Sequence, residues 1–91
     1  MAKTIAVVGA LDTKGAEFAF VKREIEGRGH KALVIDVGVV GEPGFSPDVP
    51  ASEVALAGGV SLPDLRARDD KALAMSVMTN GVAEVAKRLY E

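Results

Sequence analysis

The chain has 91 residues and a net charge of −2, which leaves room for one small domain and lacks the basic excess of a nucleic-acid-binding protein. Apolar residues make up 48% of the sequence and charged residues 26%, as in globular proteins, and the absence of Cys excludes disulfides and thiolate metal sites. We recognise no apolar run of membrane-spanning length and no signal peptide, so we expect a cytoplasmic protein that binds neither nucleic acid nor membrane.

The first part of the sequence predicts a β-α-β unit. Residues 4–9 and 32–37 are apolar runs that are too short for helices and are typical of parallel strands buried on both faces. Residues 15–28 between them have apolar residues at helical spacing. Asp12 or Thr13 is the expected N-cap of this helix, because both side chains can accept a hydrogen bond from a first-turn N–H.

The second part predicts a long loop followed by helices. Residues 38–50 are rich in Gly and Pro, which favours a loop without regular structure. Short helices are expected at 51–57 and 62–67, and a long one at 69–90. The long helix is expected to bury one apolar stripe, formed by Ala72, Met75, Met78, Val82, Val85, Ala86 and Leu89.

These elements predict the fold class α/β, specifically a Rossmann-like three-layer fragment: a β-α-β unit, then a long loop and C-terminal helices. We expect residues 1–91 to form a single domain. Two strands, however, do not make a stable sheet with helices on both faces. The chain is therefore expected to pair with another copy, to swap an element, or to be the front part of a longer protein, and the last two alternatives are compatible.

The first candidate site is the segment between the first strand and its helix. A connection from a buried strand into a helix N-terminus presents free N–H groups and a positive dipole to an anion. A Walker A motif is absent, because the order here is Thr13-Lys14-Gly15. The alternative is that Asp12 and Thr13 only cap the helix while Lys14 is solvated. The candidate ligand-binding residues are Gly9, Ala10, Leu11, Asp12, Thr13 and Lys14.

The second candidate site begins at the end of the second strand, at the same edge of the sheet. In dinucleotide-binding folds an acid in the place of Asp36 accepts hydrogen bonds from ribose hydroxyls. The alternative is that Asp36 only accepts from N–H groups of the glycine-rich loop after it. The candidate residues here are Asp36, Val37, Gly38 and Gly41.

Several short motifs in this order resemble a known family. They are Leu11-Asp12-Thr13-Lys14-Gly15, Gly29-His30, Asp36-Val37-Gly38-Val39-x-Gly41-x-Pro43 and Pro47-Asp48-Val49, followed by an Ala-rich helix that contains Met. Together they resemble the N-terminal part of the Tm-type ATP-binding domain family, named after a tomato mosaic virus resistance protein.

That resemblance implies a Rossmann-like domain that binds ATP and that associates as a homodimer. Mg²⁺ is expected beside the phosphates for a separate reason, because the Asp12 carboxylate disfavours a phosphate unless a Mg²⁺ lies between them. It also implies that residues 1–91 are the N-terminal portion of a longer nucleotide-binding domain. Residues 9–14 would lie near phosphates or Mg²⁺, and residues 36–41 near the ribose or base. No general base with an activating partner can be named, so no reaction is predicted. The alternative function is a homo-oligomerising interaction module, or a fragment that binds no ligand by itself.

Overall fold

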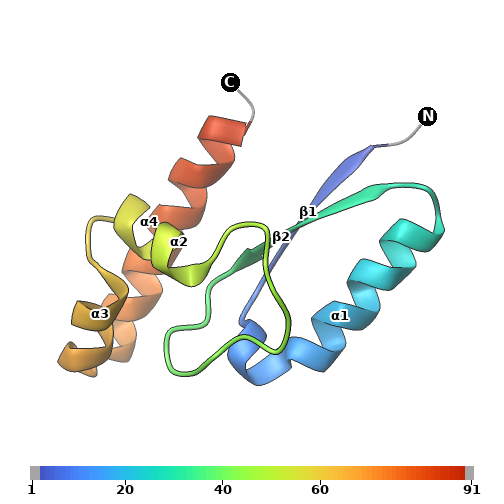
Figure 1. Ribbon diagram of the computed structural model, residues 1–91. Helices are drawn as coiled ribbons and strands as arrows, with labels where there is room; N and C mark the ends of the chain where they lie inside the picture. The colour runs from blue at the N-terminus through green and yellow to red at the C-terminus, as the bar shows by residue number, and fades with distance from the viewer. Residues whose placement is uncertain (1–2, 90–91) are drawn as a thin grey trace.

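A two-stranded parallel sheet and four helices make up the computed structural model, which describes residues 3–89 (Figure 1). Strands β1 (Thr4–Gly9) and β2 (Lys31–Asp36) pair in parallel along their whole length. Helix α1 (Leu11–Gly27) connects them. The β-α-β unit expected from the sequence is confirmed, with β2 beginning and ending one residue earlier than predicted.

Helix α1 begins earlier than expected and contains a kink. A helical turn starts at Leu11, and Lys14 then departs from helical geometry, with φ −123° and ψ 26°. The carbonyl of Leu11 accepts a hydrogen bond from the N–H of Gly44 at 3.1 Å. Gly15 lies so close to Gly44 that an added Cβ would be 3.2 Å from its Cα. The kink therefore accommodates a loop residue that is distant in the sequence.

The remaining helices are α2 (Ala51–Ala57), α3 (Leu62–Arg68) and α4 (Lys71–Leu89). Their predicted positions agree with the structure to within two residues over the described part of the chain, and the predicted last residue of the long helix, residue 90, lies outside the described residues. The Asp70 carboxylate precedes α4 and accepts a hydrogen bond from the Leu73 N–H at 3.0 Å, which is an N-cap contact. No helix within residues 3–89 is long and apolar enough to cross a membrane.

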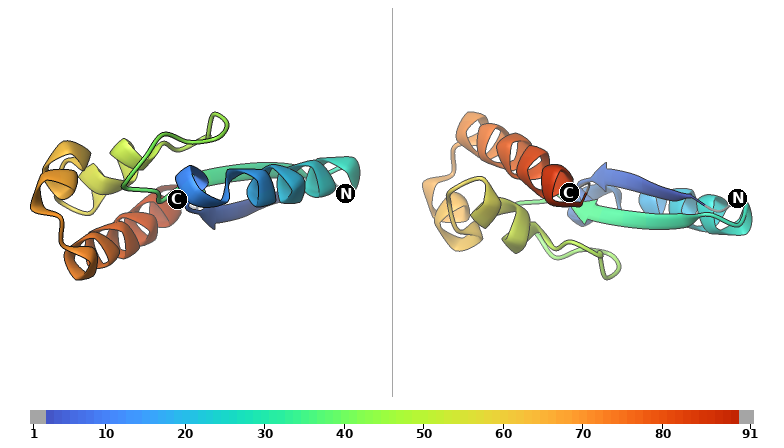
Figure 2. Two further views of the ribbon diagram at one scale, coloured as in Figure 1. Left: turned by 90° about the horizontal axis from the view of Figure 1, so that it is seen from below. Right: turned by 90° about the horizontal axis from the view of Figure 1, so that it is seen from above.

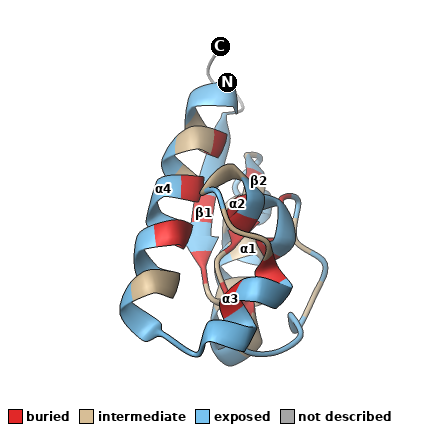
Figure 3. Cartoon of the chain, turned by 90° about the vertical axis from the view of Figure 1, so that its left-hand side faces the viewer, coloured by how far each residue is buried: buried red, intermediate tan, exposed pale blue. Residues whose placement is uncertain are grey.

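The sheet has helices on both sides, and the main core lies between β2 and the α2–α4 group. Helix α1 packs along both strands, whereas Ile35 of β2 belongs to the cluster formed with α2, α3 and α4. Figure 3 shows the buried residues concentrated on the inward-facing sides of these elements. The buried members of this cluster are Ile35, Val49, Ala51, Val54, Ala55, Leu62, Leu65, Val77, Met78 and Val85. The structure is thus a small α/β domain.

Helices α2 and α4 meet through glycines. An added Cβ on Gly81 of α4 would overlap the carbonyl oxygen of Val54, and one on Gly58 after α2 would overlap that of Val77. Side chains at these positions would hold the backbones apart. The two glycines therefore allow the close approach of α2 and α4.

Two burial expectations were wrong. The apolar stripe of α4 is rotated, because Val77 and Gly81 are buried while Met75 is 73% exposed. Strand β1 was expected to be covered on both faces, yet Val8 is 44% exposed. Both exposed side chains line one groove between β1 and α4.

Candidate functional site

Two hollows meet the edge of the sheet where β1 and β2 end. An apolar groove of about 830 Å³, here called the α4 groove, lies between β1 and α4. A smaller cavity of about 270 Å³ lies under the loop after β2. The α4 groove is lined by Val8, Ala10, Thr13, Val37, Val39, Val40, Lys71, Ala74, Met75, Met78, Thr79 and Val82. The smaller cavity is lined by Asp36, Gly38, Gly41, Glu42, Pro43, Pro47, Pro50, Ala51, Ser52, Leu62 and Arg66.

Asp36 connects the ends of the two strands. Its side chain is buried, with only 3% of the residue exposed. The Oδ1 atom accepts hydrogen bonds from the N–H of Leu11 at 3.1 Å and of Gly38 at 2.8 Å. These contacts match the second of the two roles considered for Asp36, the one in which it accepts from loop N–H groups. Its role toward a ribose stays a prediction.

Asp12 holds the glycine-rich loop rather than capping α1. Its Oδ2 atom accepts from the N–H groups of Val40 at 3.2 Å and Gly41 at 3.0 Å. The N-cap position of α1 is Ala10, and no side chain caps it. The expectation that Asp12 or Thr13 caps the helix was therefore wrong, because α1 starts before both residues.

Gly38 separates the two carboxylates. An added Cβ there would lie 2.5 Å from Asp12 Oδ1 and 3.1 Å from Asp36 Oδ1. Asp12 Oδ1 is buried and has no hydrogen-bond partner among residues 3–89. The two aspartates and this glycine thus form a compact junction between α1 and the loop.

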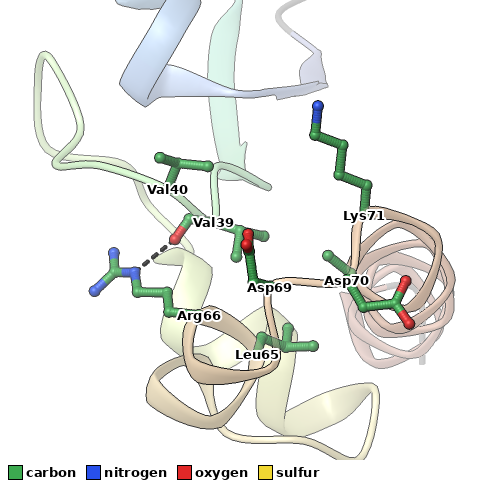
Figure 4. Close-up of a pocket in the computed structure, with 8 residues that line it drawn as sticks. Val39, Val40, Leu65, Arg66, Asp69, Asp70 and Lys71 are labelled. Carbon is green, nitrogen blue, oxygen red and sulfur yellow. Dashed lines mark hydrogen bonds between the residues drawn. The ribbon is translucent and has the colours of Figure 1, made fainter.

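Arg66 of α3 holds the same loop from the other side. Its guanidinium donates hydrogen bonds to the carbonyl of Val39 and, at 3.4 Å, to that of Gly41. Figure 4 shows the Arg66 side chain reaching Val39, while Lys71 extends from the start of α4 on the other side of this region. Residues 39–41 are therefore held by hydrogen bonds to the Asp12 carboxylate on one side and to the Arg66 guanidinium on the other.

The first turn of α1 retains hydrogen-bond donors for a ligand. The first four N–H groups of an α-helix have no partner within the helix. Leu11 donates to Asp36 and Lys14 to the Ala10 carbonyl at 2.9 Å. Within residues 3–89 no such contact is recorded for the N–H of Asp12 or Thr13. Thr13 and Lys71 line the same groove, so a hydroxyl and an ammonium group share this hollow.

The predicted site residues divide between the two hollows. Ala10, Thr13 and Val37 line the α4 groove, whereas Asp36, Gly38 and Gly41 line the smaller cavity. Of the other predicted residues, Leu11 is buried at the junction, and the Gly9 carbonyl accepts a hydrogen bond from the Val37 N–H at 3.0 Å. Lys14 is exposed at the kink.

Sequence reasoning missed Lys71 and Arg66. The signal for Lys71 was available, since a helix that follows a parallel strand and returns along the sheet must start at the carboxyl edge. Arg66 gave no such signal, because its partners are backbone carbonyls that any sequence would provide. No group of three or more His, Asp or Glu side chains that could hold a metal ion occurs within residues 3–89.

In a comparison with protein families, residues 3–91 match the N-terminal domain of an uncharacterised protein family, UPF0261. The chain belongs to the UPF0261 family. A UPF0261 protein of Clostridium tetani is 49% identical over 89 residues, which are 98% of this chain and 22% of that protein. A UPF0261 protein of Brucella suis is 32% identical over 87 residues, which are 96% of this chain and 21% of that one.

The chain therefore spans about a fifth of the length of the curated relatives it matches. The expected membership of the Tm-type ATP-binding domain family was wrong, because both the family match and the relatives point to UPF0261. The motifs that carried that resemblance are short and individually common. No solved structure shows a significant match to this chain.

Proposed function

We propose that this UPF0261 domain binds a nucleotide, with Mg-ATP as the ligand to test, at the carboxyl edge of a Rossmann-like sheet. The observation that carries the proposal is that Thr13 and Lys71 line one groove at that edge. Open α/β sheets bind ligands outside the carboxyl ends of their strands. The contacts of this edge, rather than a family assignment, support the proposal.

The polar end of the α4 groove suits a phosphate chain. The N-termini of α1 and α4 both lie at this edge, and Ala10, Thr13 and Lys71 line the groove there. Helix N-termini favour anions through free N–H groups and the positive end of the dipole. Lys71 adds a full positive charge, and the Thr13 hydroxyl can donate a further hydrogen bond.

The apolar walls suit the nucleoside. Val37, Val39 and Val40 line the groove beside its polar end, and ligand sites are mostly apolar with a few polar groups that fix orientation. A hollow of about 830 Å³ is also within the usual range for small-molecule sites. Both Asp12 oxygens are engaged or buried. In this proposal Mg²⁺ is therefore carried by the phosphates, and no side chain here is assigned to it.

The test is calorimetric titration of Mg-ATP into the parent chain and two variants, Lys71→Met and Lys87→Met. Hydrogen bonds to charged groups contribute about 1.5–3 kcal/mol, so Lys71→Met is expected to weaken binding by roughly tenfold or more. Lys87 is exposed in the last turn of the same helix and does not line the groove, so Lys87→Met should bind like the parent.

Thermal unfolding of the same proteins with Mg-ATP provides a second readout. Ligand at about a hundred times its Kd stabilises the folded state by about 2.7 kcal/mol, so the parent midpoint should rise clearly. No binding and no rise for the parent would overturn the proposal for this chain. Equal affinity in Lys71→Met would overturn the assignment of Lys71. Inorganic triphosphate and adenosine, titrated separately, show which end of the ligand is recognised.

A second candidate function is self-association, as a homodimerising interaction module. Exposed apolar residues favour it, notably Val8 at 44% and Met75 at 73% exposure, which line the same groove. Contiguous exposed apolar surface often marks an interface. In this case the unfolding midpoint would rise with protein concentration and would not respond to ATP.

A further inference from the structure

The outer edge of β2 is closed by the chain itself. The loop segment 48–49 runs beside it, and Ile35 forms a parallel bridge with Val49. The N–H of Asp36 donates to the Val49 carbonyl at 3.0 Å, and the N–H of Val34 donates to Asp48 Oδ2 at 2.7 Å. No further strand can join the sheet on this side unless these bonds break.

The outer edge of β1 is open. The carbonyls of Lys3 and Gly9 accept from β2 residue Lys31 and from Val37 after it. Because successive residues of a strand turn their N–H and C=O groups to opposite edges, Thr4, Ala6 and Val8 turn theirs away from β2. No partner for these groups is recorded within residues 3–89. An apolar strand with a row of free backbone groups is a template for another strand.

One face of β1 is also uncovered, and α4 forms the wall opposite it. On β1, Val7 and Gly9 are buried, whereas Ala6 and Val8 on the other face are exposed. The α4 groove begins at Val8 and is lined across from it by Met75, Met78 and Val82. Figure 2 shows α4 on the side of β1 and the loop after β2 on the opposite side.

The position of α4 indicates which edge the chain returns to. Connections between parallel strands are almost always right-handed. Helix α1 joins β1 to β2 and packs on one face, whereas α4 packs with the cluster on the other face. A right-handed connection through a helix on that second face leads back past β2 to the far side of β1. Figure 1 shows α4 ending at the end of the molecule where β1 begins, as a further parallel strand requires.

We propose that in full-length UPF0261 proteins the open edge of β1 and the part of the α4 groove at Val8, Met75 and Val82 receive a parallel strand, supplied by the polypeptide that follows α4. The relatives have ample chain for it, since the matched segment is only 22% and 21% of their length. The strand covers Val8 and Met75 and leaves the polar end at Thr13 and Lys71 open. The proposal does not depend on nucleotide binding, because none of its observations concerns a ligand.

The test is residue-resolved amide hydrogen exchange on the full-length Clostridium tetani relative, without nucleotide, at the segment that aligns with Thr4–Gly9. With strands on both sides, all amides of this segment are paired. Those aligned with Thr4, Ala6 and Val8 should then exchange at least about a hundredfold more slowly than in an unstructured peptide. Amides aligned with Val34 and Asp36 are the control, since the chain already pairs both of them.

An alternating pattern in the full-length relative, with those three positions fast and the intervening ones slow, would leave β1 an edge strand and overturn the proposal. Protection that disappears on dilution would assign the edge to a second copy and overturn it as well. In the 91-residue chain the same three amides should exchange fast. Slow, concentration-independent exchange there would show that the edge is already closed.

Discussion

Gly38 shows how closely the junction at the sheet edge is packed. A methyl group there would lie 2.5 Å from Asp12 Oδ1, so Gly38→Ala must displace a carboxylate or the loop. Overpacking of this kind costs about 1–3 kcal/mol, and urea denaturation should show the loss. Gly27→Ala is the matched control, because no atom of the described residues lies within 4 Å of a Cβ at that position. If both variants unfold at the same urea concentration, position 38 is not packed as closely against Asp12 as the structure shows.

Asp12 should matter for its two hydrogen bonds rather than for its charge. Asp12→Ala leaves the N–H groups of Val40 and Gly41 without their acceptor. Because both hydrogen bonds are exposed to solvent, we expect a loss of about 0.5–1.5 kcal/mol for each. Asp12→Asn retains one carbonyl oxygen as acceptor and places an amide donor where the unpartnered Oδ1 lies beside Asp36. We expect its denaturation midpoint to equal or exceed that of the parent. A loss as large as that of Asp12→Ala would contradict this reading.

Asp36 illustrates a limit of reasoning from motifs at the level of single residues. Its position at the end of a strand indicated a ribose contact or a loop contact equally well, because both need a carboxylate there. Only the fold brings Leu11 next to Gly38 and shows what Oδ1 accepts. For the same reason Asp36→Ala is a poor probe of nucleotide binding. It would destabilise the junction itself, whereas a substitution at Lys71 would not.

At the scale of elements, the packing of α2 on α4 makes a prediction of its own. Gly→Ala within a helix normally stabilises it by about 1 kcal/mol. At Gly81 the added methyl group would overlap the Val54 carbonyl oxygen of α2. Gly81→Ala should therefore destabilise the chain by about 1–3 kcal/mol, measured by thermal unfolding. A stabilising effect would mean that α2 and α4 are farther apart.

The sequence predicted elements well where local signals determine them. Helix α2 occurs at residues 51–57 as expected, since Pro50 precedes it and Gly58 follows it. The start of α1 was missed, because its kink depends on Gly44, which lies far along the chain. The buried face of α4 differs from the predicted one for a similar reason. The apolar residues of α4 are spread around much of its circumference, and the contact of Gly81 with α2 determines which of them are buried.

For the whole molecule, the sequence predicted both of the strands that form the sheet, and two strands are too few for an independent sheet. It could not show which edge is open. That asymmetry arises because Asp48 and Val49 pair with β2, a contact between a loop and a strand that no periodicity reveals. The uncovered face of β1 explains why this strand has the composition of a buried strand while Val8 is exposed.

Proline substitutions in β1 test which of its backbone groups are free. Ala6→Pro removes an N–H at the open edge, where proline is tolerated, and should lower the stability of the 91-residue chain by no more than about 1 kcal/mol. The N–H of Ile5 faces β2, so Ile5→Pro should cost about 1–3 kcal/mol more than Ile5→Ala, the variant that accounts for the lost side chain. Urea denaturation of the three variants gives these differences. If proline lowers the free energy of unfolding equally at the two positions, both edges of β1 are paired in the chain alone. That result would contradict the alternation inferred from Lys3 and Gly9.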